Sequence, residues 1–203
     1  MQANALYANS SMADALIQIV DEQNRPIGAA TKQEAWAKGL YHRVSRIMVD
    51  DGHGRIVLQK RAADRLLYPG CWDNSVAGLV DHQETFDDAA TRELFEELGI
   101  RARLTLVGDY VTRGRSDNKI LNRFTKVYSL TIDRGTKLTP EAEAISELRW
   151  FTLQEIRELV RNHPDQVTDG LADVIEKYYA TTPRSHRVAL TPLTAQYNEG
   201  YNI

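Results

Sequence analysis

Short apolar runs and longer stretches with helical periodicity alternate along the 203-residue chain. The short runs are rich in branched aliphatic residues, which is typical of strands. They predict strands at 15–20, 42–49, 55–60, 103–112, 123–132 and 148–151. The periodic stretches predict helices at 32–38, 85–98, 152–162 and 170–180. Strands that alternate with helices in this way favour an α/β/α sandwich around a central mixed β-sheet.

Local signals define several of these boundaries. Thr31 and Thr152 are each followed three residues later by a glutamate, which predicts a capping box at the start of a helix. The segment 50–54 contains two glycines between two apolar runs, so it predicts a hairpin between the strands at 42–49 and 55–60. The segment 113–121 is polar and is predicted to be a loop.

The helix at 85–98 carries the most informative pattern. Ala90, Leu94 and Leu98 form an apolar stripe that should face the core. Three carboxylates, Glu93, Glu96 and Glu97, lie beside it at i, i+3 and i+4. Like charges at this spacing cost a helix roughly 0.2–0.5 kcal/mol each, and at the carboxyl end they also oppose the helix dipole. A hard divalent cation would relieve both penalties, whereas the alternative interpretation is a solvated acidic helix end.

The residues around these carboxylates decide between the two interpretations. The window 78–100 reads GLVDHQETFDDAATRELFEELGI and holds nine residues at fixed offsets: Gly78, Glu84, Arg92, Glu93, Leu94, Glu96, Glu97, Gly99 and Ile100. This pattern resembles the Nudix box, without gap or substitution. The resemblance implies a Nudix α/β/α sandwich and hydrolysis of a diphosphate bond with Mg²⁺ or Mn²⁺.

The resemblance also implies roles for individual residues. Glu93, Glu96 and Glu97 are expected to bind metal and carry catalysis, Glu93 and Glu97 most dependably. Glu84 and Arg92 are expected to pair and support the loop before the helix. The Gly78 carbonyl is a further expected metal ligand, although a glycine there also suits a positive φ or a close approach. Glu143 is a candidate for an additional ligand, against the alternative of a solvated acidic loop.

Phosphate groups of a substrate should be bound by basic residues. The candidates are Arg61, Arg65, Arg113, Arg115 and Lys119, with Arg123 next to them in the sequence. His42 is expected to be a satisfied histidine rather than a ligand. Tyr68 and Trp72 either stack on a substrate or pack in the core.

A second resemblance concerns the segment 68–78, YPGCWDNSVAG, and the layout up to His42. It is similar to the isopentenyl-diphosphate isomerase branch of the same superfamily. The positions that carry the branch's nucleophilic cysteine and a metal-binding histidine are Ala77 and Leu79 here, and another expected histidine falls near Ala35. The Glu-x-Glu motif falls at 121–123, which holds no carboxylate. The sequence therefore favours a hydrolase on an isomerase-like frame.

Composition limits the remaining function classes. A formal net charge of −3 argues against a nucleic-acid partner, and no apolar run approaches a membrane span. The single cysteine, Cys71, fits a reducing compartment, and the first residues do not resemble a signal peptide, so a cytoplasmic location is expected. We expect a flexible arm at 1–13, one domain at 14–180 and a tail at 181–203.

The expected partner is a small-molecule diphosphate: a nucleotide, a sugar nucleotide or a prenyl diphosphate. The resemblance also makes a homodimer an expectation. A Nudix domain that senses a nucleotide or sugar nucleotide without turnover is the alternative function. An isomerase is a third hypothesis, weakened by the missing cysteine.

Overall fold

The long strand β3 (Tyr41–Asp50) lies at the centre of a nine-stranded mixed sheet in the computed structural model, which describes residues 15–180. It pairs in parallel with β8 (Lys119–Thr131) and antiparallel with β6 (Val76–Leu79). Its two ends pair with β1 (Leu16–Val20) and β4 (Arg55–Arg61). On one side of the sheet, β2 (Pro26–Thr31) pairs with β1, and β7 (Thr105–Ser116) pairs with β8. The strand β4 pairs with both β5 (Trp72–Asp73) and β9 (Ile145–Thr152).

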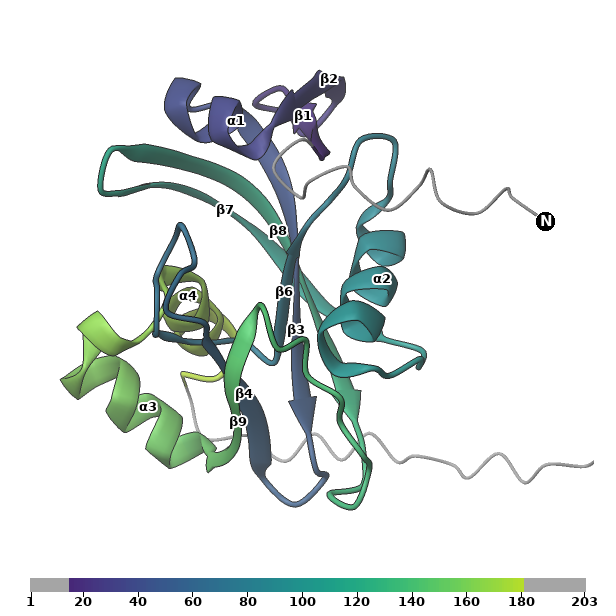
Figure 1. The fold of residues 1–203 in the computed structure, drawn as a ribbon, viewed down its shortest axis with the longest axis vertical. Coiled ribbons are helices and arrows are strands. Elements are labelled where there is room, and N and C mark those ends of the chain that lie inside the picture. Colours follow the sequence, from purple (N-terminus) through teal and green to yellow (C-terminus); the bar gives the residue numbers. More distant parts are fainter. Residues whose placement is uncertain (1–14, 181–203) are drawn as a thin grey trace, which may run out of the picture.

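Helices cover both faces of this sheet, which confirms the predicted α/β/α sandwich (Figure 1). The helices are α1 (Lys32–Lys38), α2 (Phe86–Leu98), α3 (Leu153–Asn162) and α4 (Asp169–Tyr178), with a 3₁₀ turn at Pro164–Gln166. The helix α2 packs on one face, and α3 and α4 pack on the other. Among the helices of residues 15–180, none is both long and apolar enough to cross a membrane.

The alternation of side chains along β3 builds one apolar cluster on each face. Ile47 and Val49 pack with Leu94 and Leu98 of α2. Met48, from the opposite face, packs against residues of α3 and α4. All of these β3 residues are almost fully buried, as expected of a strand that is covered on both sides. The apolar stripe predicted on α2 is therefore confirmed, since Ala90, Leu94 and Leu98 are inaccessible to solvent.

The helix ends follow the predicted capping chemistry. The hydroxyl of Thr152 accepts a hydrogen bond from Glu155 N at 3.2 Å, and Glu155 Oε2 accepts one from Thr152 N at 2.6 Å, which completes a capping box. The hydroxyls of Thr31 and Thr85 likewise accept a hydrogen bond from the backbone N–H three residues later, at the starts of α1 and α2. The full capping box predicted at Thr31 is not formed, because the Glu34 carboxylate pairs with Lys38 instead. Gly99 ends α2 with a left-handed φ of 72°. Glu96 and Glu97 therefore lie in its last turn, as expected.

The hairpin predicted around 50–54 is confirmed, but the loop predicted at 113–121 was wrong and some strands were missed. The polar segment 113–121 is the end of a long β7–β8 hairpin, because its side chains alternate around a tight turn at Asp117 and Asn118. The strands β3 and β4 pair only beside the connecting turn, because farther along β6 takes the place next to β3. The short strands β2, β5 and β6 were not predicted. The arm at 1–13 and the tail at 181–203 lie outside the described residues.

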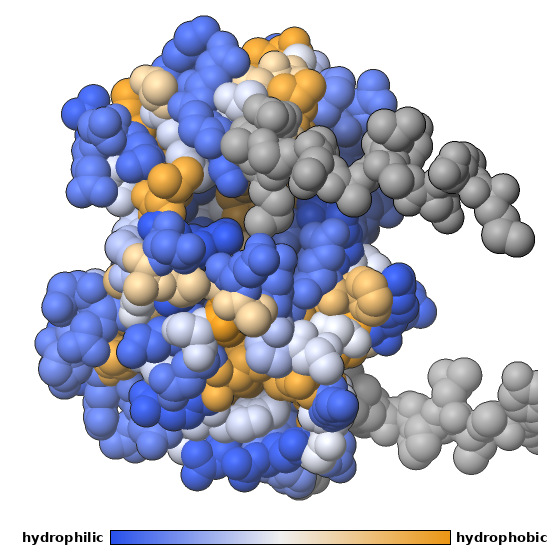
Figure 2. Space-filling view, in the orientation of Figure 1, coloured by the Kyte–Doolittle hydropathy of each residue, from blue (hydrophilic) through white to orange (hydrophobic). Residues whose placement is uncertain are grey.

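The surface has no single dominant apolar face in the view of Figure 2. Hydrophilic residues cover most of that face, and the hydrophobic ones form separate patches. One apolar residue bordering the cavity described below is Leu66, whose exposed fraction is 57%.

Candidate active site

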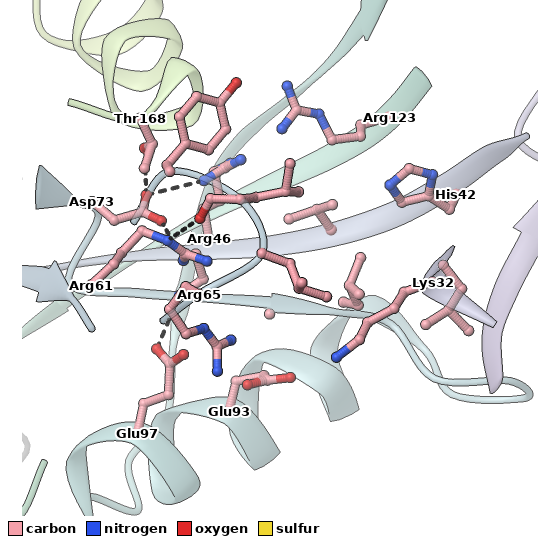
Figure 3. Close-up of a pocket in the computed structure, with 18 of the residues that line it drawn as sticks. Lys32, His42, Arg46, Arg61, Arg65, Asp73, Glu93, Glu97, Arg123 and Thr168 are labelled. Carbon is pink, nitrogen blue, oxygen red and sulfur yellow. Dashed lines mark hydrogen bonds and ion pairs between the residues drawn. The ribbon is translucent and has the colours of Figure 1, made fainter. Parts of the chain in front are cut away.

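A cavity of about 780 Å³ opens between α2, the central strands and the amino end of α4. It is lined by Glu93, Glu96 and Glu97 on one side, and residues of β3, β6, β8 and α4 complete its walls. The loop that follows β4 contributes Leu66 and Tyr68. It also contributes Arg65, which Figure 3 shows above Glu93 and Glu97. The structure therefore brings the three predicted glutamates to one cavity.

The glutamates have different environments within that cavity. Glu97 is buried, and its Oε2 accepts hydrogen bonds from Gln59 Nε2 at 3.0 Å and from the Ala77 backbone N–H at 3.2 Å. The Glu93 side chain is 15% exposed, whereas that of Glu96 is 49% exposed and pairs with Arg92 at 2.9 Å. The expected three-carboxylate face thus consists of two inward groups and one group near the solvent.

The two inward carboxylates carry an unfavourable charge in the absence of a cation. Burial raises the pKa of Glu93 to about 7, against the opposing influence of Arg92. Burial and the neighbouring Glu93 raise the pKa of Glu97 well above its usual range. Neutralisation by a cation would remove this penalty, so the donor set fits a hard divalent metal ion.

Gly78 is required because Glu93 lies against its backbone. A Cβ atom at residue 78 would stand 1.9 Å from Glu93 Cδ. The predicted close approach is confirmed. The other suggestion, a positive φ, was wrong, because the φ of Gly78 is not positive. The segment that supplies the predicted backbone ligand is therefore held directly beside the Glu93 carboxylate.

The donor set would leave part of a metal's coordination to other groups. Across residues 15–180, no three His, Cys, Asp or Glu side chains converge as a ready-made metal site. Mg²⁺ usually keeps several waters and takes one or two carboxylates together with substrate phosphates. Glu93 and Glu97 would hold such an ion, and the role of the Gly78 carbonyl as a further ligand stays a prediction.

The predicted support by Glu84 and Arg92 is present. Arg92 donates from Nε to Glu84 Oε1 and from Nη2 to Glu84 Oε2, both at 2.9 Å. Its Nη2 also donates to the Leu79 carbonyl at 3.0 Å, and its Nη1 donates to Glu93 Oε1 at 2.8 Å. One guanidinium group thereby joins the loop before α2, the end of β6 and the carboxylate-bearing face of α2.

The basic residues divide into two groups. Arg61 and Arg65 line the cavity as expected, although Arg61 is held by Asp73 at 3.2 Å. Arg113, Arg115 and Lys119 do not line it, because the β7–β8 hairpin extends beyond the cavity. Arg113 instead donates a hydrogen bond to the Tyr41 hydroxyl. The structure gives these three cations no place in the site.

Lys32 is a cavity residue that the sequence did not reveal. It lies at the start of α1, and its side chain points towards Glu93 (Figure 3). Burial and the nearby Arg65 lower the pKa of Lys32. Within residues 15–180 neither Lys32 nor Arg65 forms an ion pair, so both positive charges are available to an anion. No local motif marks Lys32, because only the packing of α1 brings it to the cavity.

The remaining candidates from the sequence differ in whether they line the cavity or pack in the core. His42 is buried as expected, but only its Nδ1 is bonded, 3.0 Å from the Leu40 carbonyl oxygen, while Nε2 has no partner within the described residues. Trp72 packs in the core against Phe151, and Tyr68 lines the cavity. Glu143 is exposed and borders the cavity beside Glu141, so its role as an additional ligand stays a prediction.

Comparisons with known proteins agree with this geometry. The NUDIX domain model matches residues 40–172. The chain is 33% identical to an isopentenyl-diphosphate Delta-isomerase of Burkholderia multivorans, over 84% of this chain and 96% of that protein. It is 34% identical to an uncharacterised Nudix hydrolase of Pseudomonas aeruginosa, over 75% and 90% of the two chains.

A crystal structure of a Deinococcus radiodurans protein has a TM-score of 0.69 at 21% identity, covering 81% of this chain and 99% of that one. The fold, the sequence pattern at 78–100 and these matches point to the same class of protein. The chain belongs to the NUDIX family. Membership indicates a hydrolase acting on pyrophosphate bonds, although relatives of similar identity are named isomerases.

Proposed function

We propose that this protein is a Mg²⁺- or Mn²⁺-dependent diphosphohydrolase that cleaves the diphosphate bond of a nucleotide or another organic diphosphate. The observation that carries the proposal is the placement of Glu93 and Glu97 side by side in a cavity that also holds Lys32 and Arg65. These two cations have no ion-pair partner among residues 15–180. Carboxylates suit a divalent cation, and ammonium and guanidinium groups suit phosphate oxygens.

The chain's own residues account for the rest of the activity. Lys32 and Arg65 would bind and orient the phosphate groups over α2, and Arg92 would keep Glu93 in place through its contacts with Glu84 and Leu79. Gln59 and the Ala77 N–H fix the orientation of Glu97. A bound divalent cation supplies neutralisation of phosphate charge and a lowered pKa for water.

The isomerase is a second candidate because several relatives carry that name. Four of the positions that the isomerase pattern requires line the cavity: Ala77 and Leu79 on β6, and Leu121 and Arg123 on β8. They hold no thiol and no carboxylate, and proton transfer across an alkene needs such groups. This observation supports the hydrolase over the isomerase.

A release assay tests the proposal. Purified protein is incubated with nucleoside diphosphates and triphosphates, sugar nucleotides and isopentenyl diphosphate, with Mg²⁺, with Mn²⁺ or with EDTA. Phosphate and diphosphate release is measured, and NMR follows any isomer of isopentenyl diphosphate. Glu97→Gln removes a cavity carboxylate, and Glu176→Gln on the exposed side of α4 is the matched control.

We expect metal-dependent release that falls at least about 10²-fold in Glu97→Gln and is unchanged in Glu176→Gln, a scale typical for loss of one electrostatic group in a site. Isomer formation without release would establish the second candidate. Absence of both reactions, with a nucleotide still raising the melting temperature, would replace the hydrolase with a sensing domain.

A further inference from the structure

The strand β7 has an open edge. Within residues 15–180 it pairs only with β8, and Figure 1 shows the hairpin of these two strands extending outward from the centre of the sheet. Proline, a bulge or short length usually protects such an edge, and β2, at another edge, begins with Pro26. The stretch of β7 from Gly108 to Ser116 lies beyond its bulge, contains no proline and pairs with β8 without a further shift. Its backbone is therefore suited to pairing with one more strand.

The hairpin turn determines which residues of β7 face that edge. Ser116 and Lys119 form the last pair before the two-residue turn at 117–118. Such a closing pair exchanges both backbone hydrogen bonds, and bonded pairs then alternate with non-bonded pairs along the ladder. The even-numbered residues of this stretch are thus bonded to β8. The odd-numbered ones turn their N–H and C=O groups to the open edge: Asp109, Val111, Arg113 and Arg115.

The side chains at the open edge carry opposite charges on either side of a valine. Asp109 and Arg113 are exposed, and each stands two residues from Val111, whose exposed fraction is 44%. Within residues 15–180 neither charge forms an ion pair. Arg113 donates from Nε to the Tyr41 hydroxyl, which leaves both of its terminal nitrogens available. The segment 109–113 therefore has a charge pattern that reverses about its centre.

This pattern complements itself when two copies of β7 pair in antiparallel orientation about Val111. Each Asp109 then faces the Arg113 of the other copy, and the two Val111 side chains face each other. Opposite charges at facing positions stabilise a sheet, whereas like charges destabilise it. A pairing centred on Asp109 or on Arg113 would place two like charges face to face. One centred on Thr112 would set Val111 against Arg113 and lose the apolar pair, so the pattern favours the register about Val111.

We propose that the open edge of β7 binds the same edge of a second copy, so that the two sheets continue into each other across a two-fold axis at Val111. A two-fold contact of this kind is closed, because each copy contributes the same strand and leaves no further β7 edge for a third. The proposal is independent of the hydrolase activity. It also gives a role to Arg113, which the structure excludes from the cavity.

The helix α4 leaves space for this arrangement. Tyr178, at its carboxyl end, lies against Gly108 and donates to the Asp109 carbonyl at 3.0 Å. A carbonyl oxygen has two lone pairs, so it can accept a second hydrogen bond from the partner strand. Gly108 is about 10 Å from Val111 along the strand, at about 3.4 Å per residue. The two helices would contact the joined sheet about 20 Å apart, more than the 8–10 Å between packed helices.

A charge-reversal cycle on the full-length chain tests the pairing. Sedimentation equilibrium over rising protein concentration measures the dissociation constant of a dimer. The proteins are the wild type, Asp109→Arg, Arg113→Asp and the double variant. Glu158→Arg, at an exposed position on α3, changes the charge as much as Asp109→Arg and is the matched control. Thermal melting by circular dichroism verifies that each variant is folded.

We expect the wild type to reach twice the mass of the chain. Each single reversal should raise the dissociation constant at least about 10-fold, because it places like charges opposite each other at both ends of the pairing. The double variant should return to within about 3-fold of the wild type, and Glu158→Arg should match the wild type throughout.

A wild type that stays monomeric, or oligomers larger than a dimer, would overturn the proposal. So would undiminished dimerisation of a folded Asp109→Arg variant, or a folded double variant that does not recover. Recovery of Asp109→Arg by Arg115→Asp in place of Arg113→Asp would move the two-fold axis to Thr112 and refute the register about Val111.

Discussion

The guanidinium group of Arg46 lies flat against Gly170, so a Cβ atom at residue 170 would stand 1.9 Å from Arg46 Cζ. Arg46 is buried in β3, and Gly170 lies in the first turn of α4. Because Arg46 also pairs with Asp73, it is held from both sides. This contact sets how closely α4, and with it Asp169, approaches the cavity.

Gly170→Ala should therefore destabilise the protein by about 1–3 kcal/mol, the usual cost of overpacking a buried site. The measurement is the free energy of unfolding by urea denaturation. Gly114→Ala is the matched control, because a Cβ atom there meets nothing within 4 Å and the φ of this glycine is not positive. Equal stability of the two variants would show that Arg46 moves aside without cost.

Magnesium should stabilise the wild-type protein through Glu97. At a metal concentration 100 times the dissociation constant the gain is about 2.7 kcal/mol by mass action. Without metal, Glu97→Gln should be more stable than wild type. The substitution removes a carboxylate whose ionised form is disfavoured by burial and by the neighbouring Glu93. The variant should gain little from Mg²⁺. Thermal melting with Mg²⁺ or EDTA measures both effects, and a full metal response in Glu97→Gln would contradict the assigned ligand.

The Glu84–Arg92 pair should couple more strongly than a surface ion pair. A double-mutant cycle with Glu84→Gln and Arg92→Lys is expected to give a coupling of about 1–3 kcal/mol, since the contact is bidentate and partly buried. The exposed pair Asp21–Arg25 provides the comparison, with an expected coupling below about 1 kcal/mol. Similar values in the two cycles would mean that Arg92 does not support the loop as described.

The buried His42 should make stability depend on pH. Burial lowers the pKa of His42 to about 4, the Leu40 carbonyl opposes this shift, and the charge of Arg123 adds to it. The unfolded chain, with a pKa near 6.5, binds a proton that the folded state excludes. The free energy of unfolding should thus fall as pH drops from 6.5 towards 4, by up to about 3 kcal/mol.

The contribution of His42 is isolated by comparison with His42→Asn. Urea titrations between pH 4 and pH 7.5 should give a smaller decline for the variant than for wild type, and the two curves should run parallel above pH 7. Parallel curves throughout the range would show that His42 binds its proton equally well in the folded and unfolded states.

The sequence predicted the helix at 85–98 and the Glu84–Arg92 contact correctly, because both depend on local signals. The helix expected at 85–98 corresponds to α2, Phe86–Leu98, with Thr85 as its cap and Gly99 as its end. The contact of Glu84 with Arg92 spans only eight residues and follows the offsets of the Nudix box. Such features are visible within one window of the chain.

Features that depend on distant partners were not predicted. Arg123 and Asp169 are far apart in the sequence, and a single charge within a strand gave no sign that it would be buried. Lys32 stood in a short capped helix, where a lysine usually faces solvent. The hairpin end at 113–121 looked like a loop because exposed strands near a turn contain as many polar residues as loops do. The positions of Arg123, Asp169, Lys32 and this hairpin end are set by tertiary packing and not by local sequence.

The parallel pairing of β3 with β8 has a consequence for the order of folding. It places His42 opposite Arg123, and Arg123 in turn requires Asp169 of α4. Contacts between residues so far apart form late, because the loop between them must first be closed. A ribosome that has released α2 has therefore produced Glu93 and Glu97 but not yet the side of their cavity that β8 and α4 form. The cavity should therefore be complete only when synthesis has passed α4.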